Sequence, residues 1–355
     1  MRITGPLLML AFLGMAKAHE HHHHEHHHHH DDDHRELGKK EGRGCGTQNP
    51  NAAEQAQAKK DVENWRAKKA ARAADGLIAE ATTPITIPTY VHLIYGSNPF
   101  ENQVIGDAQA QIDVLNAAYS GSGFSFVLKG VQQFGNRKWW TCTPGTRFER
   151  QMKSDTRVGG PESLNIWFNN PGQGLLGWAQ FPDEVNRRLS TDGVVCLHSS
   201  KDGGTAAPYN QGDTLVHEVG HWLGLYHTFQ GGCTAPGDGV ADTPAEAEPA
   251  YGCPVDRDTC GSAGLDPITN YMDYSDDACM DRFSFGQIER MHALYDTYRK
   301  PEPTQPPSPT FSPSRSPSSP PVDAPPASCN YKNSRKCNRD DACTWNSTTR
   351  SCEPV

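Results

Sequence analysis

The sequence lacks any long run of apolar residues. Its 355 residues are 35% hydrophobic, below the roughly 45–50% of an ordinary globular chain by a count that also includes glycine. No apolar stretch reaches about 18 residues, which excludes a membrane-spanning helix. A block of basic residues is also missing, and Lys+Arg 33 against Asp+Glu 42 gives a net charge of −9. We therefore expect no nucleic-acid partner.

The N-terminus has the pattern of a secretory signal. Met1-Arg2 provides a positive start, residues 6–15 are apolar, and Ala16-Lys17-Ala18 places small residues at both positions that a signal peptidase reads. Residues 1–18 are therefore predicted to be a signal peptide, and the protein to be secreted and extracellular. Eleven cysteines agree with an oxidising compartment.

A histidine-rich tract follows. Residues 19–34 read HEHHHHEHHHHHDDDH, which has nothing to bury and is predicted to be disordered. Tandem imidazoles chelate divalent metals, so surface metal binding is one interpretation. A solvated spacer, which we favour, and an expression tag are the others.

Composition divides the rest of the chain into four segments. Residues 35–84 are charged and alanine-rich, with an exposed helix expected over 51–74. Residues 85–300 carry the apolar patterns of a folded domain. Residues 301–328 form a Pro/Ser-rich linker. Residues 329–355 contain four cysteines and form a module so small that two disulfides would have to hold it together.

Strand and helix patterns are mixed within the folded domain. Strand patterns occupy 85–95, 124–131, 164–168, 175–181 and 194–197. Helical spacing occupies 107–119 and 213–225. This combination predicts an α/β (α+β) fold with a mixed, twisted sheet.

One short motif indicates a metal site. His217 and His221 are four residues apart, so on a helix they project from one face and can share a metal. Glu218 lies beside the pair, within reach of a water molecule at the metal. Gly224 allows the helix to end with positive φ, so that the chain turns and His227 completes a third ligand. Three neutral imidazoles leave one tetrahedral position open, which is typical of a catalytic zinc site.

These residues, with two later stretches, resemble a known family. HEVGHWLGLYHTF at 217–229 matches the metzincin motif HExxHxxGxxH. GDGVADTPAEAEPAYGCP at 237–254 and DPITNYMDYSDDACMDRFSFGQIERM at 266–291 are similar to the pappalysin (cytophagalysin, M43) family, especially the small secreted metalloproteases of fungi. The resemblance covers about residues 85–299. It implies a zincin-like metzincin domain with an active-site helix, a Met-turn and a C-terminal helix.

The resemblance implies a role for each matching residue. His217, His221 and His227 would bind one catalytic zinc. Glu218 would be the general base that takes a proton from the attacking water and returns it to the leaving amine. Met272 would form an apolar floor under the metal.

Three further roles each have an alternative. Tyr274 would hydrogen-bond the oxyanion of the tetrahedral intermediate, or is a packing aromatic. Residues 174–181 would be the edge strand that pairs with extended substrate, or a plain core strand. A loop of oxygen donors would bind structural calcium, or is simply solvated. The calcium candidates are Asp238, Asp242, Thr243 and Glu246.

An odd number of cysteines leaves at least one thiol unpaired within the chain. The resemblance implies two disulfides, Cys233–Cys260 and Cys253–Cys279. The last four cysteines would pair within their own module, which leaves Cys142 and Cys196 as a further pair.

Cys45 remains, flanked by glycines in the stretch RGCGT at 43–47. Its thiolate could occupy the fourth zinc position and keep a protease silent until cleavage. Pappalysin relatives have a similar RxCGT segment, so we interpret residues 35–84 as the pro-segment of a latent zymogen, with Cys45 as a candidate cysteine switch. An ordinary disulfide is the alternative.

The predicted function is therefore that of a secreted zinc metalloendopeptidase, a hydrolase that acts on proteins and peptides. An inactive descendant that binds through its C-terminal module would be expected to lose a ligand or Glu218, and neither is lost. A metal-sequestering protein centred on the histidine tract would bind many ions weakly, whereas a protease binds one zinc tightly. The C-terminal module would bind an unidentified extracellular ligand or have no partner, and we expect a monomer.

Overall fold

The computed structural model describes residues 43–75, 84–98, 108–301 and 343–354. The chain divides into two units, Met1–Pro301 and Glu302–Val355. The predicted signal peptide, the histidine tract, nearly all of the Pro/Ser-rich linker and the start of the Cys-rich module lie outside the described residues. Within the described ranges, no helix has the length and apolar character needed to cross a membrane.

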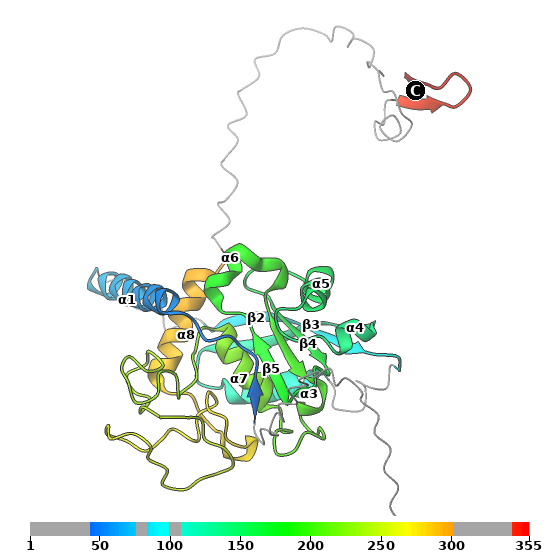
Figure 1. Ribbon diagram of the computed structural model, residues 1–355. Helices are drawn as coiled ribbons and strands as arrows, with labels where there is room; N and C mark the ends of the chain where they lie inside the picture. Colours follow the sequence, from blue (N-terminus) through cyan, green and yellow to red (C-terminus); the bar gives the residue numbers. More distant parts are fainter. Residues whose placement is uncertain (1–42, 76–83, 99–107, 302–342, 355) are drawn as a thin grey trace, which may run out of the picture. The chain divides into compact units, whose positions relative to one another are not determined.

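A six-stranded sheet forms the centre of the first unit (Figure 1). Its strands lie in the order β1, β5, β6, β4, β2, β3. Strand β5 is antiparallel to β6, and the other neighbouring pairs are parallel, so the predicted mixed sheet is confirmed. The strands are β1 (Gly44–Cys45), β2 (Ile85–Tyr95), β3 (Phe124–Gly135), β4 (Leu164–Asn169), β5 (Leu175–Ala179) and β6 (Val194–Leu197).

Helices cover both faces of the sheet. Helices α3, α7 and α8 contribute to the core on one face, α4 and α5 to the core on the other, and α1 packs on α8. The helices are α1 (Ala52–Ala74), α3 (Ala108–Ala118), α4 (Arg137–Trp140), α5 (Arg147–Thr156), α6 (Val185–Arg188), α7 (Asp213–Trp222) and α8 (Phe285–Tyr298). Short 3₁₀ helices are η1 (Pro182–Glu184), η2 (Leu189–Thr191), η3 (His198–Ser200) and η4 (Asp277–Cys279).

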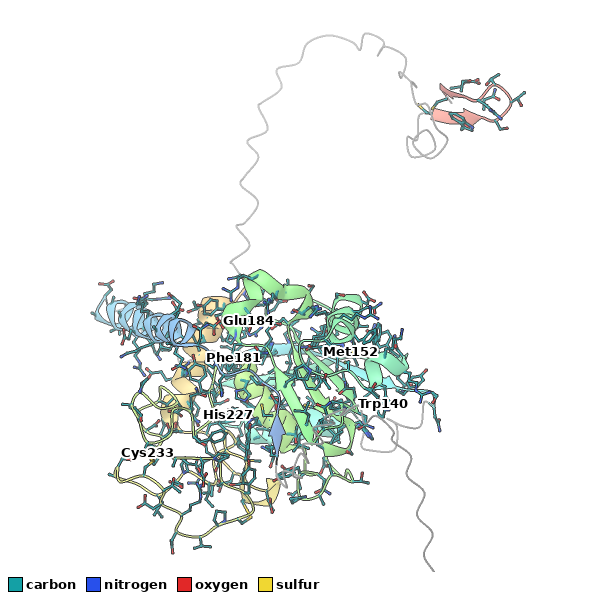
Figure 2. All side chains as sticks on the ribbon, viewed as in Figure 1. Trp140, Met152, Phe181, Glu184, His227 and Cys233 are labelled. Atoms are coloured by element: carbon teal, nitrogen blue, oxygen red, sulfur yellow. A yellow bond between two sulfur atoms is a disulfide. The ribbon has the colours of Figure 1, made fainter. Side chains whose placement is uncertain are left out.

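Alternate residues of the inner strands fill these two cores. On β6, Val194 and Cys196 face the core beneath α7, whereas Val195 faces the opposite core. That second core contains Trp140 of α4 and Met152 of α5 (Figure 2). A largely parallel sheet is buried on both faces in this way, which is why the inner strands are almost continuously apolar.

The expected Cys142–Cys196 disulfide is wrong, because both residues are free thiols. Cys142 belongs to the core that contains α4 and α5, whereas Cys196 points from β6 into the core beneath α7. The sheet separates the two side chains. Both are buried, and burial raises the pKa of the Cys142 thiol to about 12.

A long irregular segment connects α7 to α8. Two disulfides close loops within it, Cys233–Cys260 and Cys253–Cys279, with sequence separations of 27 and 26. These are the pairs that the family resemblance implied. In a chain-entropy model, each contributes about 3–4 kcal/mol by restricting the unfolded chain, which supports a segment with little regular structure.

In the second unit, β7 (Cys343–Asn346) and β8 (Ser351–Pro354) form an antiparallel hairpin. Cys343 and Cys352 are both disulfide-bonded. Disulfides are the expected support for a module too small to have its own core.

Candidate active site and metal centre

Helix α7 carries the first two histidines of the candidate metal centre. All of its residues are buried, as expected of a helix within the domain interior. Leu215, Val216 and Val219 pack in the core against the sheet. His217 and His221 are one helical turn apart on another side of the helix.

A turn at Gly224 brings the chain to His227, the third histidine. Gly224 has φ +104°, a conformation that glycine adopts without strain. A Cβ at this position would lie 2.3 Å from Cδ1 of Leu294 on α8. The turn is closed by the Leu225 amide, which donates to the Gly220 carbonyl at 2.9 Å, and the chain then reaches His227.

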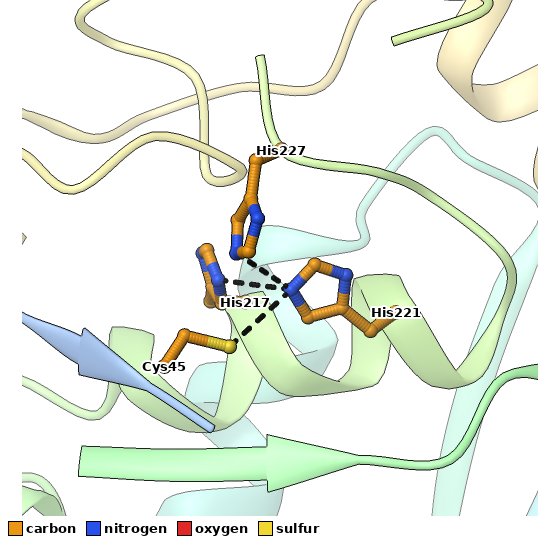
Figure 3. Close-up of side chains that lie close together, drawn as sticks. All are labelled: Cys45, His217, His221 and His227. Atoms are coloured by element: carbon orange, nitrogen blue, oxygen red, sulfur yellow. Dashed lines mark hydrogen bonds between the residues drawn. The ribbon is translucent and has the colours of Figure 1, made fainter. Parts of the chain in front are cut away.

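Three imidazole nitrogens and one sulfur converge on a common point (Figure 3). Nε2 of His221 lies 3.2 Å from Nε2 of His217 and 3.1 Å from Nε2 of His227. It lies 3.6 Å from Sγ of Cys45. Tetrahedral zinc, with bonds of about 2.0–2.1 Å to nitrogen and about 2.3 Å to sulfur, spaces two nitrogens roughly 3.3 Å apart and nitrogen from sulfur roughly 3.6 Å apart. The three spacings around His221 therefore fit zinc, and all four donor atoms lie within 4.8 Å of one another.

The ring protons of two histidines are directed away from that point. Nδ1 of His217 donates to the Tyr271 carbonyl at 2.7 Å, and Nδ1 of His221 donates to the Leu225 carbonyl at 2.8 Å. Burial lowers the pKa of both rings, to about 4 for His221, so both are neutral at pH 7. Each Nε2 then presents a bare lone pair. Two such lone pairs 3.2 Å apart repel each other unless a cation lies between them.

Met272 packs against the histidine helix. It is fully buried, and a Cβ on Gly220 would lie 2.4 Å from its sulfur. The glycine therefore allows the thioether to approach the backbone between His217 and His221. The next segment continues to Tyr274, whose hydroxyl lies 3.3 Å from Nε2 of His227.

Glu218 is buried and lies on the side of α7 next to β5. A Cβ on Gly177 of β5 would lie 2.7 Å from its Cγ, so only glycine leaves room for the carboxylate there. Oε2 of Glu218 accepts a hydrogen bond from Oγ1 of Thr47 at 2.9 Å and lies 3.6 Å from Sγ of Cys45. Burial raises the pKa of the Glu218 carboxyl to about 7.

Strand β1 places Cys45 at this site by pairing with the edge of β5. Gly44 pairs with Leu175, and Cys45 with Gly177. A Cβ on Gly44 would lie 2.3 Å from the Gly174 carbonyl oxygen, so the glycine beside Cys45 is needed for this close approach. Burial, followed by the charge of Glu218, raises the pKa of the Cys45 thiol. A metal ion within bonding distance has the opposite effect and deprotonates a coordinating thiol.

Two neighbours of Cys45 hold the strand in place. Arg43 is buried, with Nη2 2.6 Å from Oδ1 of Asp277, and its guanidinium lies 5.3 Å from the centre of the Tyr209 ring. Oγ1 of Thr47 also accepts a hydrogen bond from the Ala179 amide at 2.9 Å. Thr47 thus bonds both the carboxylate of Glu218 and the backbone of β5.

Proteins with related sequences identify the family of this chain. A sequence profile of the peptidase M43 family, described as pregnancy-associated plasma protein-A, matches residues 174–296. An extracellular metalloprotease of Pyricularia oryzae is 43% identical over 237 residues, which cover 65% of this chain and 82% of that protein. Extracellular metalloprotease 1 of Coccidioides posadasii is 42% identical over 237 residues, which cover 65% and 84%. The chain belongs to the pappalysin family of metalloproteases.

Solved structures of related proteins share the fold. Mature mirolysin of Tannerella forsythia, in complex with a cleaved peptide, matches with a TM-score of 0.53 and 34% identity over 60% of this chain and 92% of mirolysin. A promirolysin mutant from the same organism matches with a TM-score of 0.55 and 29% identity over 72% and 94%. The metzincin fold is therefore confirmed, and this pappalysin is a zinc metalloendopeptidase.

Each calcium candidate of this pappalysin has a hydrogen-bond or ion-pair partner within the protein. Oδ1 and Oδ2 of Asp238 accept hydrogen bonds from Thr243, at 2.9 and 2.8 Å. Asp242 accepts from Ser284 and from the Gly286 amide at the start of α8. Glu246 accepts from Thr228 and pairs with Arg257. Protein donors thus occupy these carboxylates, and among the described residues the one group with metal-ligand spacing is Cys45 with the three histidines.

The contacts of Thr47, Gly177 and Arg43 in this pappalysin were not predicted from the sequence. A signal for two of them was present, because Arg43 and Thr47 belong to the RGCGT stretch that singled out Cys45. Gly177 interrupts an apolar run, and a glycine inside a strand pattern often marks a close approach by another group.

Proposed function

We propose that this pappalysin is a secreted endopeptidase made as a latent precursor, with one catalytic zinc held by His217, His221 and His227. The observation that carries the proposal is the convergence of three imidazole nitrogens and the sulfur of Cys45, all within 4.8 Å of one another. When bound, zinc supplies a Lewis acid that lowers the pKa of a water molecule and polarises the scissile carbonyl.

Glu218 would transfer the proton of the reaction. It would accept a proton from the attacking water as the water oxygen bonds to the carbonyl carbon, and donate it to the amide nitrogen as the C–N bond breaks. Tyr274 would donate its hydroxyl to the oxygen on which negative charge develops. The position of that hydroxyl, 3.3 Å from a ring nitrogen of His227, supports this role.

Extended substrate would pair with β5. This strand is hydrogen-bonded to β6 on one side, and its other side is covered by β1. Removal of β1 would leave the backbone groups of Leu175–Ala179 unpaired beside the metal centre. An unpaired strand edge is a template for binding an extended peptide.

The catalytic assignment is tested on the chain after cleavage between Asp75 and Pro84 and removal of the part before the cut. Two versions are compared, one with the natural sequence and one with Glu218→Ala. The first should hydrolyse denatured protein and contain one zinc. The variant should keep the zinc and lose at least about 10²–10⁴-fold in rate. If both bind one zinc and neither is active, a binding protein built on this fold becomes the better interpretation.

Latency would follow from the seated state of β1, in which this strand is paired with β5 and Cys45 lies beside the three histidines. The Cys45 sulfur would take the fourth zinc position, where an open position is needed for catalysis. We therefore interpret residues 35–84 as a pro-segment that cleavage between α1 and β2 would release. The Cys45→Ser variant should make the uncleaved chain active, and the idea is wrong if that variant stays as latent as the unchanged chain.

The remaining assignments stay predictions with their own tests. If a structural calcium ion binds at Asp238, Asp242, Thr243 and Glu246, the melting temperature of the protein should be higher with added calcium than with a calcium-selective chelator. Secretion after removal of residues 1–18 is checked by N-terminal sequencing of the exported protein. The monomeric state is checked by sedimentation, and a ligand for the C-terminal module by binding to extracellular polymers.

A further inference from the structure

Two buried arginines, Arg290 on α8 and Arg299 at the C-cap of that helix, lie at the end of the histidine helix. Nε of Arg299 donates to the Trp222 carbonyl at 3.0 Å, and Nε of Arg290 donates to the Gly224 carbonyl at 2.8 Å. The last carbonyls of a helix have no partner within the helix and attract positive charge. Both arginines therefore satisfy acceptors at the point where α7 turns toward the third histidine.

The two arginines differ in what else they contact. Arg299 donates two further hydrogen bonds to Asp192, at 3.1 and 3.0 Å, and its guanidinium lies 3.7 Å from the centre of the Trp222 ring. Among the described residues, Nη2 of Arg290 has no hydrogen-bond partner. A buried cation with unfilled bonding capacity destabilises a fold. Stability alone therefore explains Arg299 better than Arg290.

Arg290 contacts the residues before and after Leu225 in the turn that follows α7. Its Nε bonds the carbonyl of Gly224, and its guanidinium lies 4.2 Å from the centre of the Tyr226 ring. The next residue is His227. A planar guanidinium can bond in its plane and stack through its face at the same time, which a lysine ammonium cannot do.

Two histidines depend on this turn. His227 follows it directly, and its ring lies 4.7 Å from the parallel ring of Phe229 and 5.1 Å from the edge-on ring of Tyr274. The Leu225 carbonyl accepts the Nδ1 proton of His221. A shift of residues 224–226 would therefore move His227 and also the group that orients His221.

We propose that Arg290 is a positioning residue for the metal centre, which fixes the turn at Gly224–Tyr226 and so sets the geometry of His221 and His227. This inference rests on the proposed role of the three histidines as zinc ligands. Burial raises the pKa of the Asp238 carboxyl to about 6, and the nearby positive charge of Arg290 opposes this rise. The loop that was expected to bind calcium thus carries part of the countercharge for Arg290.

The test measures zinc affinity in the full chain by competition with a chromophoric chelator. Arg290→Met should raise the zinc dissociation constant about 10–100-fold, the usual range for residues that orient metal ligands. Arg290→Lys keeps the charge and one donor but loses the planar face, so its effect should be smaller. Glu289→Gln on the same helix is the control, because Glu289 is paired with Arg66 on α1, and it should leave zinc affinity unchanged.

A second pair of variants separates positioning from general stability. In a His227→Ala background one of the positioned ligands is absent, so Arg290→Met should cost clearly less zinc affinity there than in the unchanged chain. Equal losses in the two backgrounds would assign Arg290 a purely structural role and overturn the proposal. An Arg290→Met chain that is folded by circular dichroism and binds zinc within about twofold of the unchanged chain would also overturn it.

The outcome stays decisive if Arg290→Met does not fold. Arg290→Lys then takes its place, and unchanged zinc affinity in that variant overturns the proposal. If the unchanged chain binds no zinc, the proposed function itself fails. If the unchanged chain binds zinc and the arginine variants bind it equally well, only this inference fails.

Discussion

Replacing Arg43 by methionine should make the uncleaved chain measurably active. Arg43 is 3% exposed and Asp277 is 2% exposed. Their side chains meet at 2.6 Å, and Nη1 of Arg43 also lies 3.4 Å from the sulfur of Met280. In the variant, the Asp277 carboxylate would be buried without this partner whenever β1 is seated, and solvated when β1 leaves.

The size of the effect follows from this asymmetry. Removing one partner of a buried ion pair costs about 3–5 kcal/mol, and here the cost applies only to the seated state. At about 1.4 kcal/mol per tenfold change, the ratio of open to seated chains rises roughly 100- to 4,000-fold. Asp277 keeps its hydrogen bond from the Gln211 amide, at 2.8 Å, so we expect a value toward the lower end.

The assay is the initial rate at which the full chain cleaves a quenched fluorescent peptide, with electrophoresis showing that the chain is still uncut. Arg66→Met is a matched control from the same proposed pro-segment. Arg66 also meets a carboxylate, Glu289, at 2.6 Å, but the two side chains are 52% and 39% exposed. Exposed pairs contribute about 0–1 kcal/mol, so the control should change the rate less than about fivefold.

Two results would refute this reasoning. Equal increases for the two variants would mean that burial of the ion pair does not determine the seating of β1. No increase for Arg43→Met, together with full activity of the Cys45→Ser chain, would mean that the sulfur alone keeps the precursor latent.

Four further predictions concern the site and its support. Gly177→Ala places a methyl group against Glu218, with a contact of 2.7 Å to be relieved, and should lower kcat at least about tenfold with zinc content unchanged; unchanged kcat contradicts the close approach. Tyr274→Phe should lower kcat about 10²–10³-fold with little change in KM, and a loss below fivefold would favour a packing role. Removal of zinc by a chelator should lower the melting temperature, and zinc alone should restore it. Glu149→Gln leaves the buried Lys153 without its partner, which should cost about 3–5 kcal/mol in urea unfolding at pH 7. Burial raises the pKa of Glu149, but Lys153 and its hydrogen-bond donors outweigh burial and hold that pKa below the ordinary 4.5. The stability that this carboxylate contributes is therefore present above pH 4.5 and lost as the pH falls below it, so the difference between the unchanged chain and Glu149→Gln should shrink there and persist at higher pH.

Much of the sheet and the histidine helix could be predicted from local pattern. The β-branched run at 85–95 became β2 with the same bounds, and the helix expected at 213–225 became α7 at 213–222. Strand β3 continues to Gly135, beyond the predicted 131, because it pairs with β2 as far as Tyr95. The end of a strand is set by its partner, which the residues of the strand do not reveal.

Other elements have no local signal because their partners are remote in sequence. Helix α5 reads RFERQMKSDT and buries Glu149 and Lys153, which count as surface residues until their mutual ion pair is known. Strand β1 has two residues, Gly44 and Cys45, and exists because the edge of β5 accepts it. The odd cysteine and its glycine neighbours indicated the site of Cys45, but not the strand pairing that brings it there.

In the proposed mechanism, latency would be shared among three contacts of one strand. The Cys45 sulfur lies beside the histidine nitrogens, Thr47 bonds the carboxylate of Glu218, and β1 covers the edge of β5. Arg43 seats that strand without touching the metal ligands. The Cys45→Ser chain should therefore be active only in the fraction of time that β1 is unseated, and adding Arg43→Met should raise its rate further. Since both changes act on one equilibrium between seated and open chains, their effects on the logarithm of the rate should add until most chains are open. A double variant no more active than Cys45→Ser, at a rate well below that of the cleaved enzyme, would contradict this shared mechanism.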